Sequence, residues 1–149
     1  MIELLDKSAP IPYDLLLIAD ESVESIDKYI HNSDIFTYKS GDILWGLYAL
    51  QKIDEVVVEI KNIAVFPEYQ GRGIGQFMLI DAIRRAKTMG FKRITIGTGD
   101  LGVRQIKLYQ KVGFEIYDVK KNFFVDNFPE PIYEDGKQLV DMVMLKIDL

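Results

Sequence analysis

The spacing of hydrophobic residues divides the first third of the chain into a short strand, two short helices and a hairpin. Helices are expected at residues 13–19 and 23–30, because Pro12 suits a first helical turn and Ser22 is a good N-cap. Residues 35–39 and 43–51 are apolar and aromatic-rich, with the turn residues 40–42 between them. This pattern predicts two antiparallel strands joined by a tight turn.

The rest of the chain alternates strand and helix. Residues 56–65 are rich in β-branched side chains and stop before Pro67, which predicts a third long strand. A helical repeat follows and ends at Gly90; its apolar positions are Ile74, Met78, Leu79, Ala82, Ile83 and Ala86. We expect a strand at 92–97, a helix at 101–112 closed by Gly113, a strand within 114–125, a loop at 126–137 and a final strand at 139–147.

This order of elements predicts one α/β (α+β) domain over residues 1–149. A strand–helix–strand crossover requires a parallel pair, whereas the hairpins require antiparallel pairs. The sheet should therefore be mixed and twisted, with about six to seven strands and helices on both faces. No repeat or linker divides the chain.

Composition narrows the chemistry. The 149 residues include no cysteine, which excludes disulfides, thiolate zinc sites and a cysteine nucleophile. The N-terminus lacks the pattern of a signal peptide, and no apolar run approaches a membrane span, so a cytoplasmic location is expected. A net charge of -5 disfavours nucleic acid and favours cationic partners. No spacing of His, Asp and Glu is typical of a metal site.

The most informative segment is the glycine-rich loop from Gln70 to Gly75, between a strand and a helix. Its glycines and the free N–H groups of the first helical turn predict an anion site, most naturally for a diphosphate. A P-loop is excluded because no lysine follows Gly75, and the dinucleotide fingerprint Gly-x-Gly-x-x-Gly fails from either Gly71 or Gly73. The pattern Gln-x-x-Gly-x-Gly remains.

This pattern resembles the coenzyme A loop of the GCN5-related N-acetyltransferases (GNAT). A second segment, Leu108 to Glu115, is similar to the Leu-Tyr-x-x-x-Gly-Phe motif of that family. The resemblance runs from about residue 35 to residue 114 and implies the GNAT fold, with acetyl-CoA as acetyl donor and no metal. One position departs from it: many members carry Asn where this chain has Gly102.

The resemblance also implies which residues bind the donor. Backbone amides of the loop would hold the pyrophosphate, with Arg72 as an extra charge, and the preceding strand would pair with the pantetheine arm. An N–H near Ile63 would polarise the thioester carbonyl. The implied cofactor-binding residues are Ile63, Ala64, Val65, Gln70, Gly71, Arg72, Gly73, Ile74, Gly75, Gln76 and Tyr109.

Two side chains are candidates for proton transfer. Tyr109 lies in the family motif and is expected to protonate the departing thiolate; the alternative is a core aromatic on an amphipathic helix. Glu59 lies in an apolar strand where some members carry a glutamate base, and would accept a proton from the amine. The alternative for Glu59 is a carboxylate on the solvent side of the strand, alternating with Glu55 and Lys61.

The acceptor is predicted only by class. An acidic surface favours a cationic small-molecule amine, attacked directly in a ternary complex because no cysteine or Ser–His pair offers a covalent route. A protein N-terminus or lysine, and a non-catalytic acyl-CoA-binding module, are the alternatives. Acidic and aromatic residues within 123–137 are candidates for gripping a cation. Members of the family often form homodimers, which makes residues 139–147 a candidate interface strand.

Overall fold

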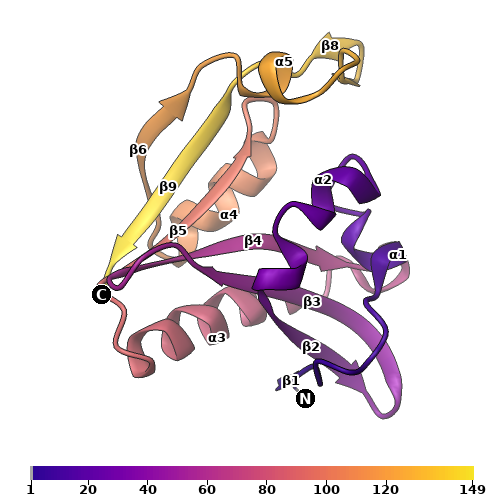
Figure 1. Cartoon of the computed structure of the whole chain (residues 1–149), viewed down its shortest axis with the longest axis vertical. Helices are drawn as coiled ribbons and strands as arrows, with labels where there is room; N and C mark the ends of the chain where they lie inside the picture. Colours follow the sequence, from indigo (N-terminus) through magenta and orange to yellow (C-terminus); the bar gives the residue numbers. More distant parts are fainter. Residues whose placement is uncertain (1) are drawn as a thin grey trace.

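The computed structural model describes residues 2–149 and contains a seven-stranded mixed sheet (Figure 1). Its strands, in spatial order, are β1 (Ile2–Leu4), β2 (Asp34–Ser40), β3 (Ile43–Lys52), β4 (Val57–Val65), β5 (Arg93–Gly99), β9 (Met142–Asp148) and β6 (Glu115–Lys120). Neighbours pair antiparallel, except β4 and β5, which are parallel. The predicted mixed α/β sheet is confirmed.

Helices cover both faces of this sheet, as expected. The helices are α1 (Tyr13–Leu16), α2 (Val23–Asp27), the 3-10 turns η1 (Ile30–Asn32) and η2 (Pro67–Tyr69), α3 (Ile74–Thr88), α4 (Val103–Val112) and α5 (Phe123–Asn127). One apolar core packs α3 and α4 against the sheet, and a second core packs α1 and α2 against β3 and β4. The two cores share the central strands and place their helices on opposite sides.

A β-bulge in β4 explains how one strand serves both cores. Ala49 pairs with Asn62 and Leu50 pairs with Ile60, so Lys61 has no partner residue on β3. The extra residue reverses which face the following side chains occupy. Buried Ile60 therefore belongs to the α3 core, whereas buried Ala64 belongs to the α1–α2 core. Buried and partly buried residues alternate along all of β4, but the buried side chains change face at the bulge.

The sheet opens between its two parallel strands. Pairing between β4 and β5 runs only from Val57–Arg93 to Ile60–Ile96. Beyond it, β4 stays paired to β3 and β5 stays paired to β9, and the two halves of the sheet diverge (Figure 1). The backbone of β4 past Ile60 therefore has no strand beside it on the β5 side.

The segment 126–137, expected as a loop, is more ordered than predicted. It holds a two-stranded hairpin, β7 (Tyr133–Glu134) and β8 (Lys137–Gln138), and α5 begins before it. The turn is Asp135–Gly136, and both residues have positive φ (50° and 78°). An Asp-Gly pair is a strong signal for such a two-residue hairpin. The hairpin was not predicted because the prolines nearby favoured a loop.

The final strand, the candidate interface of a homodimer, lies inside the sheet, and the homodimer itself stays a prediction. β9 lies between β5 and β6 and pairs with both, so its edges are already occupied. It cannot pair with a second subunit in the way a free edge strand can. Among residues 2–149 no helix has the length and apolar character needed to cross a membrane. The single domain and the cytoplasmic location stay predictions.

Candidate active site

The divergence of β4 and β5 opens a cleft of about 1090 Å³ that reaches both faces of the sheet. One end, which we call the donor end, is formed by the close of β4, the glycine loop and α4. The other, the acceptor end, is formed by the α1–α2 connection, the middle of β4, α5 and β7. Segments from nearly the whole chain thus meet around one space.

At the donor end, the glycine loop adopts the backbone that an anion site requires. Gly71 and Gly73 both have φ of 79°, a conformation that favours glycine. A Cβ placed on either would meet no heavy atom within 4 Å, so the space above the loop is open. The first helical bond of α3 is from Phe77 N–H to Gly73 O, at 3.0 Å. The three N–H groups before Phe77 therefore lie at the positive end of α3 without an intrahelical acceptor.

Two side chains of the loop behave differently from its backbone. Gln70 Nε2 donates to Val65 O at 2.8 Å and so ties the loop to the end of β4. The Arg72 guanidinium lies 5.0 Å from the Trp45 ring centroid and 5.7 Å from that of Tyr69. Arg72 is the only residue from 70 to 76 that does not line the cleft. Its predicted contribution of charge to phosphate binding stays a prediction.

The strand that leads into the loop is placed as expected for a pantetheine-binding edge. Ile63, Ala64 and Val65 all line the cleft, beyond the point where β4 leaves β5. Their side chains pack into the two cores, so what they offer a ligand is backbone. Ile74, Gly75 and Gln76 line the same end of the cleft.

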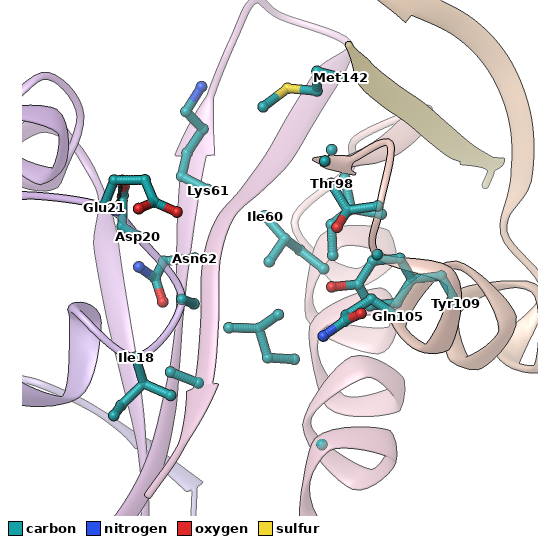
Figure 2. Close-up of a pocket in the computed structure, with 18 of the residues that line it drawn as sticks. Ile18, Asp20, Glu21, Ile60, Lys61, Asn62, Thr98, Gln105, Tyr109 and Met142 are labelled. Atoms are coloured by element: carbon teal, nitrogen blue, oxygen red, sulfur yellow. Dashed lines mark hydrogen bonds between the residues drawn. The ribbon is translucent and has the colours of Figure 1, made fainter. Parts of the chain in front are cut away.

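Tyr109 is both a core residue and a cleft residue. It is only 6% exposed and packs edge-on against Phe114, with ring centroids 6.2 Å apart. Within residues 2–149 its hydroxyl makes no hydrogen bond, and it faces the cleft beside Thr98 and Gln105 (Figure 2). Burial raises the pKa of Tyr109 to about 12. The phenol therefore remains protonated at neutral pH and can donate.

Glu59 lies on the cleft but is not the exposed carboxylate of a solvated strand. Its side chain is 15% exposed, Oε1 accepts from Thr95 Oγ1 at 2.9 Å, and Oε2 accepts from Lys61 Nζ at 2.9 Å. The side chain is held by β5 and by the bulged residue of its own strand. Glu59 directly precedes Ile60, and successive side chains of a strand point to opposite faces. Because Ile60 packs in the α3 core, Glu59 lies on the α1–α2 face of the sheet. Tyr109 comes from the helices of the other face.

The structure adds cleft residues that sequence patterns did not single out. Asp20 and Glu21, from the α1–α2 connection, lie beside Asn62 and Lys61, across the cleft from Thr98 and Tyr109 (Figure 2). The first two residues are far from the other four in the sequence, so only the folded structure shows that they line one cleft. One weak signal was available: Asn62 is a polar side chain inside an apolar strand, and it is 5% exposed.

The position of Gly102 explains its departure from the family pattern. A Cβ there would lie 2.8 Å from Thr98 Oγ1 and 3.2 Å from Gln105 Oε1. The amide of Gln105, one helical turn later, therefore occupies the space that a side chain at 102 would enter. Figure 2 shows Gln105 in the cleft beside Tyr109.

The aromatic candidates divide into two groups. Phe123, Phe124 and Phe128 line the cleft, and so does Glu134 from the hairpin. Three large aromatic residues of β2 and β3, Tyr38, Trp45 and Tyr48, do not line it. Tyr48 is fully buried on the α3 side, where its hydroxyl donates to Asp81 Oδ2 at 2.6 Å.

Comparison with known proteins identifies the family. Residues 3–114 match the acetyltransferase (GNAT) family model. The chain is 43% identical over 148 residues to the uncharacterized N-acetyltransferase YvbK of Bacillus subtilis (strain 168), covering 99% of this chain and 96% of that protein. It is 45% identical to a GNAT family acetyltransferase from Elizabethkingia anophelis solved with acetyl-CoA bound, with a TM-score of 0.96 and coverage of 100% and 97%.

A further solved relative is the IAA acetyltransferase from Bacillus cereus ATCC 14579. It is 38% identical, with a TM-score of 0.93 and coverage of 100% of this chain and 99% of that one. The glycine loop, the divergent strands and these relatives agree with the resemblance seen in the sequence. The chain belongs to the acetyltransferase (GNAT) family, and it is an N-acetyltransferase whose acetyl donor is acetyl-CoA.

Proposed function

We propose that the enzyme acetylates a primary amine on a cationic small molecule, by direct attack in a ternary complex. The observation that carries the cationic part is a pair of carboxylates at the acceptor end of the cleft. Glu21 comes from the α1–α2 connection and Glu134 from β7, and both line the cleft. Among the described residues 2–149, neither forms an ion pair with a basic side chain.

The electrostatics of this pair favour a cation between them. The pKa of Glu21 is raised, first by burial and then by the negative charges of Glu134 and Asp20. Like charges that converge without a counter-ion oppose each other's ionisation. A ligand ammonium group would relieve this repulsion. The phenylalanines of α5 and residue 128 add aromatic surface on which a cation can rest.

Basic side chains of the cleft do not cancel this preference. Lys61 is paired with Glu59, and the Lys120 ammonium lies 5.9 Å from the Phe123 ring centroid. Arg104 belongs to the first turn of α4, near the donor end. Lys28, on the acceptor side, forms no ion pair with Glu21 or Glu134 within the described chain. The two carboxylates thus remain available to a ligand.

In the proposed reaction, the loop amides and the edge of β4 hold the donor with its acetyl group in the cleft. The amine nitrogen attacks the acetyl carbon, and an N–H near Ile63 stabilises the oxygen that becomes negative. The C–S bond then breaks as the N–C bond becomes an amide. Glu59 takes the proton lost by nitrogen, directly or through water, and Tyr109 gives its proton to the departing sulfur.

The geometry supports this division of proton transfer between two sides. Glu59 lies on the α1–α2 face, where the acceptor end opens, and Tyr109 lies on α4, nearer the donor end. Glu59 already accepts two hydrogen bonds, so a water or a shift of Lys61 would link it to the amine. Tyr109 has a free hydroxyl and a raised pKa, which suit an acid.

The test is release of the CoA thiol from acetyl-CoA in the presence of single acceptors. The set contains polyamines, aminoglycosides, a peptide with a free N-terminus and a peptide with an internal lysine. It also contains IAA, because the 38% identical relative is called an IAA acetyltransferase. Turnover highest with polyamines or aminoglycosides supports the proposal. Turnover only with peptides or IAA would overturn it, and silence with all acceptors despite tight CoA binding would favour a binding module.

A further inference from the structure

Asn62 occupies an unusual place in the cleft wall. It lies on β4 two residues beyond Ile60, where pairing with β5 ends, and its side chain is buried. It lines the cleft beside Asp20 and Glu21, opposite Tyr109 (Figure 2). A buried amide at this point must satisfy its two donors and its acceptor oxygen.

The donors of Asn62 are satisfied and fix its orientation. Nδ2 donates to Leu16 O at 3.0 Å and to the Tyr29 hydroxyl oxygen at 3.1 Å. A backbone carbonyl can only accept, so the nitrogen must face Leu16 and the amide cannot be reversed. Tyr29 in turn donates its own proton to Asp20 Oδ2 at 2.8 Å. Burial raises the pKa of Tyr29, which keeps that proton in place.

The side-chain carbonyl oxygen of Asn62 is the one group of this amide without a hydrogen-bond partner in the described chain. Oδ1 is buried and has no hydrogen-bond partner within residues 2–149, a condition it shares only with Trp45 Nε1, which lies outside the cleft. Burying such a group without a partner is unfavourable, because it loses its hydrogen bonds to water. The amide is fixed in place, its N–H donors have partners, and its oxygen has none. Because it lies in the wall of a binding cleft, a ligand with a hydrogen-bond donor is the natural partner for this oxygen.

We propose that Asn62 Oδ1 accepts an N–H of the attacking amine. This inference rests on the proposed function, because it takes the amine as the acceptor. The oxygen is buried, and Asn62 and Ile18 both line the cleft on the same side of β4 (Figure 2). Contact with the amine requires the short α1–α2 connection, to which Ile18 belongs, to shift away from the oxygen. Ile18 is 44% exposed and is not part of the core beneath this connection.

The chemistry of this contact selects nitrogen over oxygen. A primary amine attacks through its lone pair and carries two hydrogens. One leaves to Glu59 or water, and the other can donate to Asn62 throughout, most strongly as nitrogen gains positive charge. An alcohol has one hydrogen, which must go to the base, so Oδ1 would lose its donor during attack. A neutral amide also cannot take the proton itself, which leaves that role to Glu59.

The experiment compares two acceptors with the same distal cation, (3-aminopropyl)trimethylammonium and (3-hydroxypropyl)trimethylammonium. Asn62→Leu removes the acceptor at similar volume, and Asn62→Asp restores an acceptor oxygen. Tyr48→Phe is the matched control, because it removes a buried hydrogen bond to Asp81 on the far side of the sheet. Measurements are kcat/KM for each acceptor, the Kd for acetyl-CoA, and the melting temperature.

We expect Asn62→Leu to lower kcat/KM for the amine about 10- to 100-fold, the loss of one charge-assisted hydrogen bond. Its preference for amine over alcohol should fall by the same factor, with the acetyl-CoA Kd unchanged. Asn62→Asp should recover part of the amine rate. Tyr48→Phe should lower the melting temperature about as much as Asn62→Leu does, yet keep the full amine rate. Amine turnover that is unaffected in Asn62→Leu overturns the inference alone, whereas a wild-type enzyme that acetylates no amine overturns the proposed function with it.

Discussion

At the donor end of the cleft, the glycine loop and the last residues of β4 present mostly backbone, whereas the acceptor end presents side chains from four separate segments. The backbone groups of the donor end lie within residues 63–76, one continuous stretch, and α4 adds Tyr109 from the other side. The acceptor groups come from the α1–α2 connection, the middle of β4, α5 and β7. A backbone site tolerates many side chains but demands a particular main-chain path. A side-chain site demands that distant segments meet.

This difference has a consequence for substrate choice. The donor end can be shared among enzymes that use one acetyl donor, because its contacts depend on glycine conformation and a helix terminus. The acceptor end can change through single substitutions in short elements, without disturbing the sheet. Substitutions at the two ends should therefore affect different kinetic constants.

The largest effect is expected from Tyr109→Phe. Loss of the acid for the thiolate should lower kcat about 1000-fold and leave the acetyl-CoA Kd unchanged, since the ring and its packing remain. Kinetics and isothermal titration measure the two quantities. Tyr117→Phe, on β6 and outside the cleft, is the control and should behave as wild type. An unchanged kcat in Tyr109→Phe would remove this residue from the mechanism.

The pH profile tests the same assignment in the wild-type enzyme. The acid must be protonated to act, and burial raises the pKa of Tyr109 from 10.0 to about 12. A raised pKa extends the protonated form to higher pH, so kcat should show no decline that begins near pH 10. A decline centred at the ordinary tyrosine pKa would mean that the acid is an unburied group.

Glu59→Gln should have the next largest effect. The amide keeps a partner for Thr95 but cannot take a proton, so kcat should fall about 100-fold at pH 7. The loss should shrink toward pH 10, because hydroxide then competes as the acceptor of the proton that nitrogen loses. Glu55→Gln, four residues earlier and highly exposed, is the matched control. Equal losses at every pH would indicate a structural role for Glu59.

The backbone character of the donor end is tested by Gly73→Ala. An L side chain at φ of 79° is strained by about 1–2 kcal/mol, and relief of that strain moves the loop N–H groups. The acetyl-CoA Kd should rise about tenfold. Gly90→Ala is matched, since Gly90 also has positive φ and open space at the other end of α3. Both should lose melting temperature, but only Gly73→Ala should lose affinity.

The smallest effect is expected at the acceptor rim. Glu21→Gln and Glu134→Gln should each raise the KM of a cationic amine about threefold, the size of an exposed charge contact. The effect should vanish in high salt. Glu24→Gln and Glu130→Gln are exposed neighbours outside the cleft and serve as controls. If none of the four substitutions changes the KM, the cation binds at another part of the cleft.

Prediction from sequence succeeded where local patterns control structure. Ser22 caps α2 through a bond from Ser25 N–H, and Gly90 and Gly113 end helices with positive φ, because these choices depend on a few neighbouring residues. The hairpin at 133–138 was missed although its Asp-Gly turn is local, since the prolines before it favoured a loop. The position of the last strand between β5 and β6 was not predicted, because strand order is a long-range property.

The sequence by itself determined the local structure of the proposed donor side, because a strand, a glycine loop and a helix follow one another in consecutive residues. Only the tertiary structure decided which side chains line the proposed acceptor end. The bulge at Lys61 sets which face Asn62 occupies, and the divergence of β4 from β5 brings that face to Glu21 and Glu134. Periodicity reports which residues share a face within an element, but the meeting of distant side chains depends on how the whole sheet twists and opens.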